Sequence, residues 1–311
     1  MNIELGIKSD CVEYRFSYEW LFALMREMGV TYLQLGTFFE FYSLEDSYFA
    51  DLSRLAERYG VRIKSIFTAH RELGGFFTGD PRMERVARHN YETLIRVASL
   101  LGADFAGSSP GAVYRDHMEK KDQGLACYVR HMHELSRIAK DRGLQALTLE
   151  PMSCLAEPPA TPEEIRALMD DFRAHHENNP EETVPVYLCA DVTHGVANRD
   201  FQVIHDSIEL FEFCLPWMAE FHFKNTDAIF GSTFGFREEE RQRGIIKADE
   251  VIQLIGKYES HQDIAPMPVK KLVGYLEIGG PKLGRDYSDH LLERDLRQSI
   301  EYLQGCLRTP W

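Results

Sequence analysis

The segment DRGLQALTLE, residues 141–150, contains the pattern whose repetition along the chain predicts the fold. Gly143 ends an amphipathic, helix-type stretch, because glycine tolerates the left-handed backbone found just beyond a helix. A short apolar strand pattern, Leu144–Leu149, follows at once, and it closes on the carboxylate of Glu150. A helix that ends at glycine and passes directly into a strand is one unit of an α/β protein.

Three more units of this kind lie toward the amino terminus. Their glycines are Gly29, Gly60 and Gly102, which lead into strand patterns over residues 30–35, 61–66 and 103–107. Four further strand patterns are Ile3–Ile7, Val186–Ala190, Ala219–Lys224 and Leu272–Ile278. Helix periodicity lies between them, over residues 17–28, 44–59, 82–101 and about 288–303. Eight strand patterns alternating with helices predict an α/β chain, residues 1–311, folded as a single (β/α)₈ TIM barrel domain with parallel strands.

The composition argues against several classes of protein. The 35 basic and 49 acidic residues give a formal charge of −14, which is the wrong sign for a protein that coats nucleic acid. Hydrophobic residues at 44% and charged residues at 27% are typical of a soluble enzyme. No apolar run approaches the ~20 residues that span a bilayer, and the amino terminus has no signal-peptide pattern. We therefore expect a cytoplasmic protein without a nucleic-acid or membrane partner.

Four side chains that can bind metal fall at or near the ends of four successive strand patterns: Glu150, Asp191, His222 and Glu277. The carboxyl ends of barrel strands meet at the face that carries the active sites of this fold. One carboxylate there is more typical of a helix cap or an ion pair, but four such residues favour a metal site, because buried charge needs a partner. Their oxygen-rich set suits Mn²⁺, Mg²⁺ or Co²⁺, with Zn²⁺ as a further candidate.

Four other residues are candidates for contacting a substrate. His194 follows Asp191 by three positions, in the next loop, and His70 ends the third strand pattern. Lys224 follows His222 by two positions, so strand alternation places both on one face. Arg243 belongs to a charged run after the seventh strand pattern and could hold a polar or anionic group. For each histidine an ordinary loop position, and for the arginine a solvated charge, is the competing interpretation.

At these residues the chain resembles the xylose-isomerase-like TIM barrels, a superfamily of sugar isomerases, ketose 3-epimerases, inosose dehydratases and endonuclease IV. The resemblance covers essentially the whole chain and is most specific over residues 149–151, 191–194, 221–224 and 276–277. It implies that Glu150, Asp191, His222 and Glu277 bind one divalent metal ion and that His194 binds substrate. It also implies a substrate-binding arginine after the seventh strand, for which Arg237, Arg241 and Arg243 compete.

The nuclease branch of that superfamily is not expected here. Endonuclease IV resembles this chain in fold but builds a three-metal cluster with further histidines after the fourth and seventh strands. Here Ser108-Ser109-Pro110 follows the fourth strand pattern, and residues 225–229 after the seventh contain no histidine. The cluster therefore cannot be completed, in agreement with the acidic charge.

The resemblance implies a metal-dependent isomerase or epimerase that acts on a small ketose or ketose phosphate through a cis-enediolate. Glu150 and Glu277 are then the two acid/base groups as well as metal ligands. The alternatives are a metal-dependent dehydratase of a keto-polyol and a non-catalytic sugar-binding barrel. The sequence leaves open the choice of sugar, the metal, and whether the chain forms a homodimer or a homotetramer.

Overall fold

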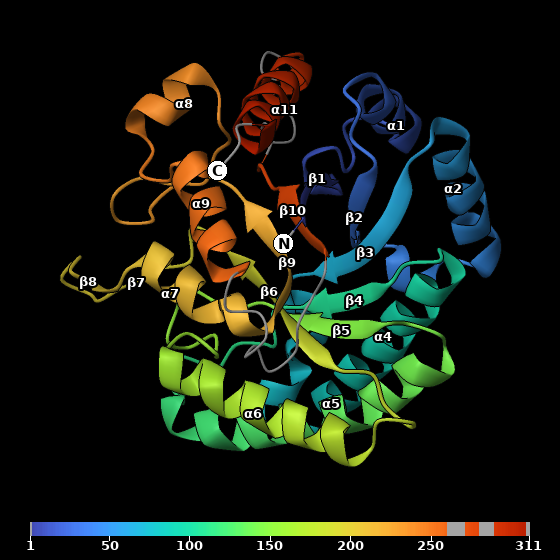
Figure 1. Cartoon of the computed structure of the whole chain (residues 1–311). Helices are drawn as coiled ribbons and strands as arrows, with labels where there is room; N and C mark the ends of the chain where they lie inside the picture. Colours follow the sequence, from blue (N-terminus) through green and yellow to red (C-terminus); the bar gives the residue numbers. More distant parts are fainter. Residues whose placement is uncertain (1, 260–270, 280–288, 309–311) are drawn as a thin grey trace.

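The barrel expected from the repeating helix–strand unit is confirmed. The computed structural model describes residues 2–259, 271–279 and 289–308, and within them eight parallel strands close into a barrel ringed by helices (Figure 1). The order around the barrel is β1-β10-β9-β6-β5-β4-β3-β2. The strands are β1 (Asn2–Lys8), β2 (Tyr32–Gly36), β3 (Arg62–Thr68), β4 (Phe105–Ser108), β5 (Ala146–Leu149), β6 (Val186–Asp191), β9 (Met218–Phe223) and β10 (Lys271–Leu276).

The helices lie between successive strands and cover the outside of the barrel (Figure 1). The α-helices of the described residues are α1 (Tyr18–Glu27), α2 (Asp46–Tyr59), α3 (His70–Leu73), α4 (Pro81–Leu100), α5 (Lys121–Asp141), α6 (Pro162–Asn178), α7 (Ser207–Cys214), α8 (Glu238–Arg243), α9 (Ala248–Glu259) and α11 (Leu292–Arg308). Short 3₁₀ helices are η1 (Ser9–Cys11), η2 (Phe41–Ser43), η3 (Gly74–Phe77), η4 (Met118–Lys120) and η5 (Leu215–Trp217). None of the helices described is long and apolar enough to cross a membrane.

The junctions between helices and strands follow the predicted chemistry. The four glycines that end helices, Gly29, Gly60, Gly102 and Gly143, have φ values between 67° and 81°, a region that costs other residues steric strain. Helix α1 begins where the Ser17 side chain accepts a hydrogen bond from the Trp20 N–H at 3.2 Å. The sequence therefore marks both ends of the helix in this repeating unit.

The sequence patterns did not predict a small two-stranded sheet. After β6 the chain forms a small antiparallel hairpin, β7 (Val196–Ala197) and β8 (Val203–His205). Strands of two and three residues are too short to show a period-two pattern. The turn between them is held by the Asn198 side chain, which accepts hydrogen bonds from the backbone N–H groups of Asp200 and Gln202.

Strand alternation gives the barrel an apolar outside and a polar interior near its centre. On β9, Phe221 and Phe223 face the helices, with the Phe221 ring centroid 5.5 Å from that of Phe211 on α7. The alternate residues Glu220 and His222 point inward and are fully buried. Inside the barrel, Glu220 Oε1 accepts hydrogen bonds from side chains on β3 and β5. This polar interior lies directly below the face at which the strands end.

Candidate metal centre

The four residues expected to bind metal converge at one edge of the barrel. Glu150 directly follows β5, Asp191 ends β6, His222 lies near the end of β9 and Glu277 directly follows β10. These four strands are neighbours in the barrel, so their carboxyl ends are adjacent. One ligand atom from each residue lies within 4.8 Å of the other three. The arrangement brings together residues that are up to 127 positions apart in the sequence (277 − 150).

The imidazole of His222 is the centre of this group. Its Nδ1 lies 3.0 Å from Glu150 Oε1, 3.0 Å from Glu277 Oε2 and 3.8 Å from Asp191 Oδ2. The side chains of His222 and Asp191 are inaccessible to solvent, whereas Glu277 retains 19% of its side-chain exposure. Glu277 is therefore the most exposed member of a group that is otherwise buried.

The charges of the group are strongly coupled. Burial raises the pKa of the Asp191 carboxyl, but electrostatic interactions with His194 and Lys224 outweigh burial and hold the pKa well below its ordinary value. Burial likewise opposes ionisation of Glu277, and Lys224 and Lys8 overcome it to lower its pKa. Burial alone would lower the pKa of His222, yet the nearby Glu277 and Glu150 carboxylates raise it well above 6.5. The carboxylates therefore remain ionised. His222 carries a proton on Nδ1, at the position where a divalent cation could bind instead.

The donor set fits a divalent cation. The Asp191 Oδ2 atom is buried and has no hydrogen bond of acceptable geometry among the described residues, although the Lys224 ammonium lies 2.5 Å away. The buried carboxylates of the group also disfavour one another's ionisation, Glu277 acting on Glu150 and Asp191 acting on Glu277, and a divalent cation between them would relieve this repulsion. Three carboxylates and one imidazole nitrogen match the hard, oxygen-rich preference of Mn²⁺ and Mg²⁺ and are also acceptable to Co²⁺ and Zn²⁺.

Two lysines lie against the group. Lys224, just beyond β9, contacts Glu277 Oε2 at 3.3 Å in addition to Asp191. Lys8, the last residue of β1, contacts Glu277 Oε1 at 3.1 Å and Asp10 at 3.1 Å. Sequence reasoning identified Lys224 but missed Lys8. A charged residue directly after an apolar strand was the signal, the same one that identified Glu150 and Asp191.

The residues predicted to contact substrate do not all lie next to the four clustered residues. The His194 Nδ1 donates a hydrogen bond to the Pro151 carbonyl oxygen at 2.7 Å, and Nε2 lies 3.6 Å from Asp191 Oδ2. His194 therefore lies beside the four clustered residues. His70 is the first residue of α3, but its side chain lies outside the described part of the structure.

Arg243 lies apart from the cluster. It is the last residue of α8, is exposed, and its guanidinium lies 4.0 Å from the centroid of the Phe234 ring. Among the described residues it makes no ion pair with any of the four clustered side chains. It lines a separate cavity of about 270 Å³ together with Arg237 and Gly279, which is two positions beyond Glu277.

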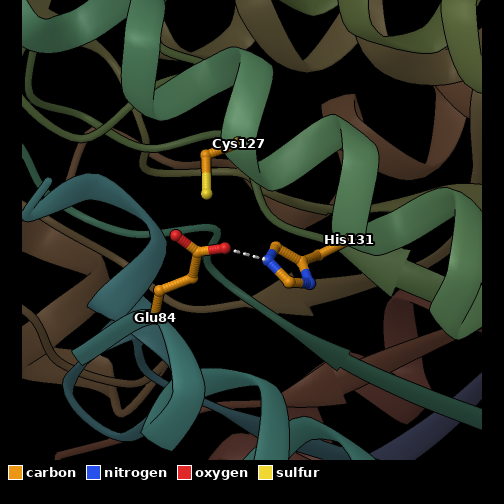
Figure 2. Close-up of side chains that lie close together, drawn as sticks. All are labelled: Glu84, Cys127 and His131. Atoms are coloured by element: carbon orange, nitrogen blue, oxygen red, sulfur yellow. Dashed lines mark hydrogen bonds and ion pairs between the residues drawn. The ribbon is translucent and has the colours of Figure 1, made fainter. Parts of the chain in front are cut away.

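A second group of ligand-type side chains lies on the outside of the barrel (Figure 2). Glu84 from α4 faces Cys127 and His131, which are four residues apart on α5. Glu84 Oε1 lies 2.8 Å from His131 Nε2, the dashed contact in Figure 2. The guanidinium of Arg88 lies 3.2 Å from the other ring nitrogen, Nδ1.

The arginines determine what this outer group does. A guanidinium can only donate hydrogen bonds, so Nδ1 of His131 must accept, and the ring proton of neutral His131 is on Nε2 and donated to Glu84. A second guanidinium, from Arg130, donates to Glu84 Oε1 at 2.9 Å and to Cys127 Sγ at 3.5 Å. Every ligand atom is already engaged beside a positive charge. We interpret the group as a hydrogen-bonded ion-pair cluster that joins α4 to α5.

Comparisons with known proteins agree with this architecture. The family model described as xylose isomerase-like TIM barrel matches residues 22–260. No curated protein sequence matches the chain. A Rhodospirillum rubrum protein classed provisionally as a xylose isomerase superposes with a TM-score of 0.79 at 18% identity, covering 99% of this chain and 100% of that one.

Two further solved structures are similar over nearly their full length. The D-psicose 3-epimerase of Clostridium cellulolyticum H10, solved with D-tagatose, has a TM-score of 0.69 at 14% identity and covers 98% of this chain and 100% of its own. The IolI protein with a bound zinc atom has a TM-score of 0.67 at 15% identity, with 98% of this chain and 97% of that chain covered. At these identities the likeness establishes the fold.

Proposed function

The chain belongs to the xylose isomerase-like TIM barrel family. From that premise we propose that the protein is a divalent-metal-dependent isomerase or epimerase that acts on a small ketose or ketose phosphate. The observation that carries the proposal is the convergence of four ligand atoms within 4.8 Å at the carboxyl ends of four adjacent strands. The reaction would pass through a cis-enediolate of the sugar. Solved structures of the same fold include an epimerase bound to a ketose and a protein with bound zinc.

Glu150, Asp191, His222 and Glu277 would hold one divalent ion, Mn²⁺, Mg²⁺ or Co²⁺, with Zn²⁺ also compatible with the donor set. When bound there, such an ion polarises a substrate carbonyl and makes the neighbouring C–H more acidic. The carboxylates supply the negative charge that holds the ion, and His222 supplies a neutral nitrogen once its Nδ1 proton is displaced.

Glu150 and Glu277 would move the proton. Each carboxylate has two oxygens, so one can contact the ion while the other faces the sugar. In this structure Glu150 Oε1 contacts His222. The other carboxylate oxygen, Glu150 Oε2, makes no ion pair or hydrogen bond with the described residues. Both oxygens of Glu277 contact lysines, Oε1 contacting Lys8 and Oε2 contacting Lys224. Removal of a proton by one glutamate and its return by the other would invert the carbon, whereas return to the neighbouring carbon would interconvert aldose and ketose.

His194 and Lys224 would orient the sugar. The His194 Nδ1–H is donated to the Pro151 carbonyl, which leaves Nε2 as an acceptor for a substrate hydroxyl. The Lys224 ammonium lies between Asp191 and Glu277 and can donate to a substrate oxygen that carries developing negative charge. His70 and Arg243 remain predicted substrate contacts.

Exchange of a carbon-bound proton tests this proposal. The protein is incubated in D₂O with Mn²⁺ or Mg²⁺ and with free and phosphorylated ketoses; each reaction is then quenched, and the metal is removed before the sugars are examined by NMR. Deuterium next to the carbonyl, together with a new epimer or aldose, is the expected result, and it should disappear when the metal is chelated. Loss of water from the substrate would identify a dehydratase instead. Binding of sugar without exchange or water loss would contradict an enzymatic role and favour a sugar-binding barrel.

A further inference from the structure

Gln34 is a buried polar residue in a strand that is otherwise apolar. It lies in the middle of β2, between Leu33 and Leu35, and has no exposed surface. Its Oε1 lies 2.8 Å from Nε2 of His222, on the far side of the barrel interior. A leucine of similar volume would suit the apolar strand, and burial of an amide is unfavourable unless its hydrogen bonds are made. The side chain therefore has a specific partner rather than a packing role alone.

The orientation of the Gln34 amide is fixed by its other contacts. Its Nε2 donates to the sulfur of Cys189 at 3.8 Å, and it also interacts with the Glu220 carboxyl below. Both neighbours can accept a hydrogen bond, which places the NH₂ end toward them and the carbonyl oxygen toward His222. The Cys189 sulfur lies 3.4 Å from His222 Nε2 as well, so it can accept from both N–H groups.

This orientation determines which ring nitrogen of His222 can bind a cation. A carbonyl oxygen only accepts, so Nε2 must carry a hydrogen and donate it to Gln34. In the neutral ring the lone pair is then on Nδ1, the atom that lies 3.0 Å from both Glu150 and Glu277. The partner of a metal-binding histidine commonly sets its tautomer and ring orientation in this way.

We propose that Gln34 is a positioning residue that holds His222 in the Nε2–H tautomer and presents Nδ1 to the divalent cation. This inference rests on the proposed metal site. Gln34 does not touch the cation or the sugar and acts only through the imidazole. Loss of such a partner weakens metal binding by about 10- to 100-fold in comparable sites.

The test compares three variants of the full chain. Gln34→Met keeps the length of the side chain and removes the acceptor. Gln34→Glu is the conservative variant, because a carboxylate also accepts from Nε2–H. Thr148→Val is the matched control, since Thr148 is equally buried in the barrel but donates to Glu220 at 2.8 Å and not to His222. Thermal unfolding shows that each variant is folded before it is compared.

The first readout is the Kd for Mn²⁺, measured by competition with a chelating dye in the absence of sugar. Gln34→Met should bind Mn²⁺ about 10- to 100-fold more weakly, whereas Gln34→Glu and Thr148→Val should stay within about threefold of the parent protein. Folded Gln34→Met with unchanged Mn²⁺ affinity would overturn the inference. Absence of Mn²⁺ binding by the parent protein would instead overturn the proposed metal site, so the two failures are distinguishable.

The second readout is the tautomer itself. Long-range ¹H–¹⁵N NMR of histidine-labelled, metal-free protein, at a pH above the pKa of His222, should show His222 with its hydrogen on Nε2, and Gln34→Met should show a mixture of tautomers. Gln34→Glu should restore the single Nε2–H form. A His222 that keeps a pure Nε2–H tautomer in Gln34→Met would contradict the role, because a residue that only fills space would not move this signal.

Discussion

The candidate metal centre of Glu150, Asp191, His222 and Glu277 and the outer cluster of Glu84, Cys127 and His131 contain similar side chains. They differ in the group that contacts the second ring nitrogen of the histidine. At the centre, His222 Nε2 faces the Gln34 carbonyl oxygen, an acceptor, at 2.8 Å. In the outer cluster, His131 Nδ1 faces the Arg88 guanidinium, a donor, at 3.2 Å. An acceptor behind the ring frees the opposite nitrogen for a cation, whereas a donor behind it commits the opposite nitrogen to donate. Proximity of ligand-type residues is therefore insufficient to identify a metal site.

The largest expected effect separates the two groups by metal binding. Asp191→Ala removes a fully buried ligand and leaves only three of the four donor residues. The variant should therefore bind Mn²⁺ about 100-fold more weakly or worse. His131→Ala should leave both the stoichiometry and the affinity unchanged. Equilibrium dialysis with metal analysis measures both. Loss of a bound ion in His131→Ala, with one retained in Asp191→Ala, would reverse the comparison.

A second large effect is expected in catalysis. Glu150→Gln and Glu277→Gln keep the shape of the side chain but remove the base, and each should lower the rate of C–H exchange by about 10²- to 10⁴-fold. Glu84→Gln is the matched control, since Glu84 is a carboxylate of the outer cluster, and should exchange at the parent rate. Circular dichroism establishes that the fold is intact. Parent-like exchange in both barrel variants would exclude their acid/base role.

Metal binding at the candidate metal centre should also depend on pH through His222. The pKa of His222 is raised well above 6.5, because its carboxylate neighbours outweigh the effect of burial. Below that raised pKa the ring carries a proton on Nδ1 that the cation must displace. The Mn²⁺ affinity should therefore rise about tenfold per pH unit, with release of about one proton per ion. Calorimetry in buffers of different ionisation enthalpy measures the released proton, and pH-independent affinity would show that the ring is already neutral.

The smallest effect is expected on stability. His131 is buried, stacks on Phe76 at 4.5 Å and joins Glu84 to Arg88. His131→Ala should lower the free energy of unfolding by about 1–3 kcal/mol, the usual range for loss of a buried, hydrogen-bonded side chain. Urea unfolding measures the change. An unchanged free energy of unfolding would show that the outer cluster does not join α4 to α5 in any energetically useful way.

Much of this architecture could be predicted because its determinants are local. Glycine at the end of a helix, as at Gly143, and an apolar run directly after it specify a helix–strand junction within about ten residues. Repetition of that junction predicts parallel strands, and parallel strands bring Glu150 and Asp191 to the same face. The convergence of the four ligand-type residues followed from this topology alone.

The residues that were missed depend on contacts across the barrel. Gln34 is 188 positions from His222, and in its strand pattern it is a single polar residue between Leu33 and Leu35. Lys8 is 269 positions from Glu277, and a lysine after a strand is ordinary in a surface loop. Which polar group faces which is set by strand register and barrel closure, and a sequence pattern does not encode these directly.

The most direct test of the metal centre is anomalous scattering from crystals grown with Mn²⁺. One strong peak is expected at the carboxyl ends of β5, β6, β9 and β10, coordinated by Glu150, Asp191, Glu277 and Nδ1 of His222. No peak is expected between α4 and α5 at the outer cluster. Absence of a peak at the four strand ends at saturating Mn²⁺, or a peak at Glu84, Cys127 and His131 in its place, would exclude the proposed metal centre.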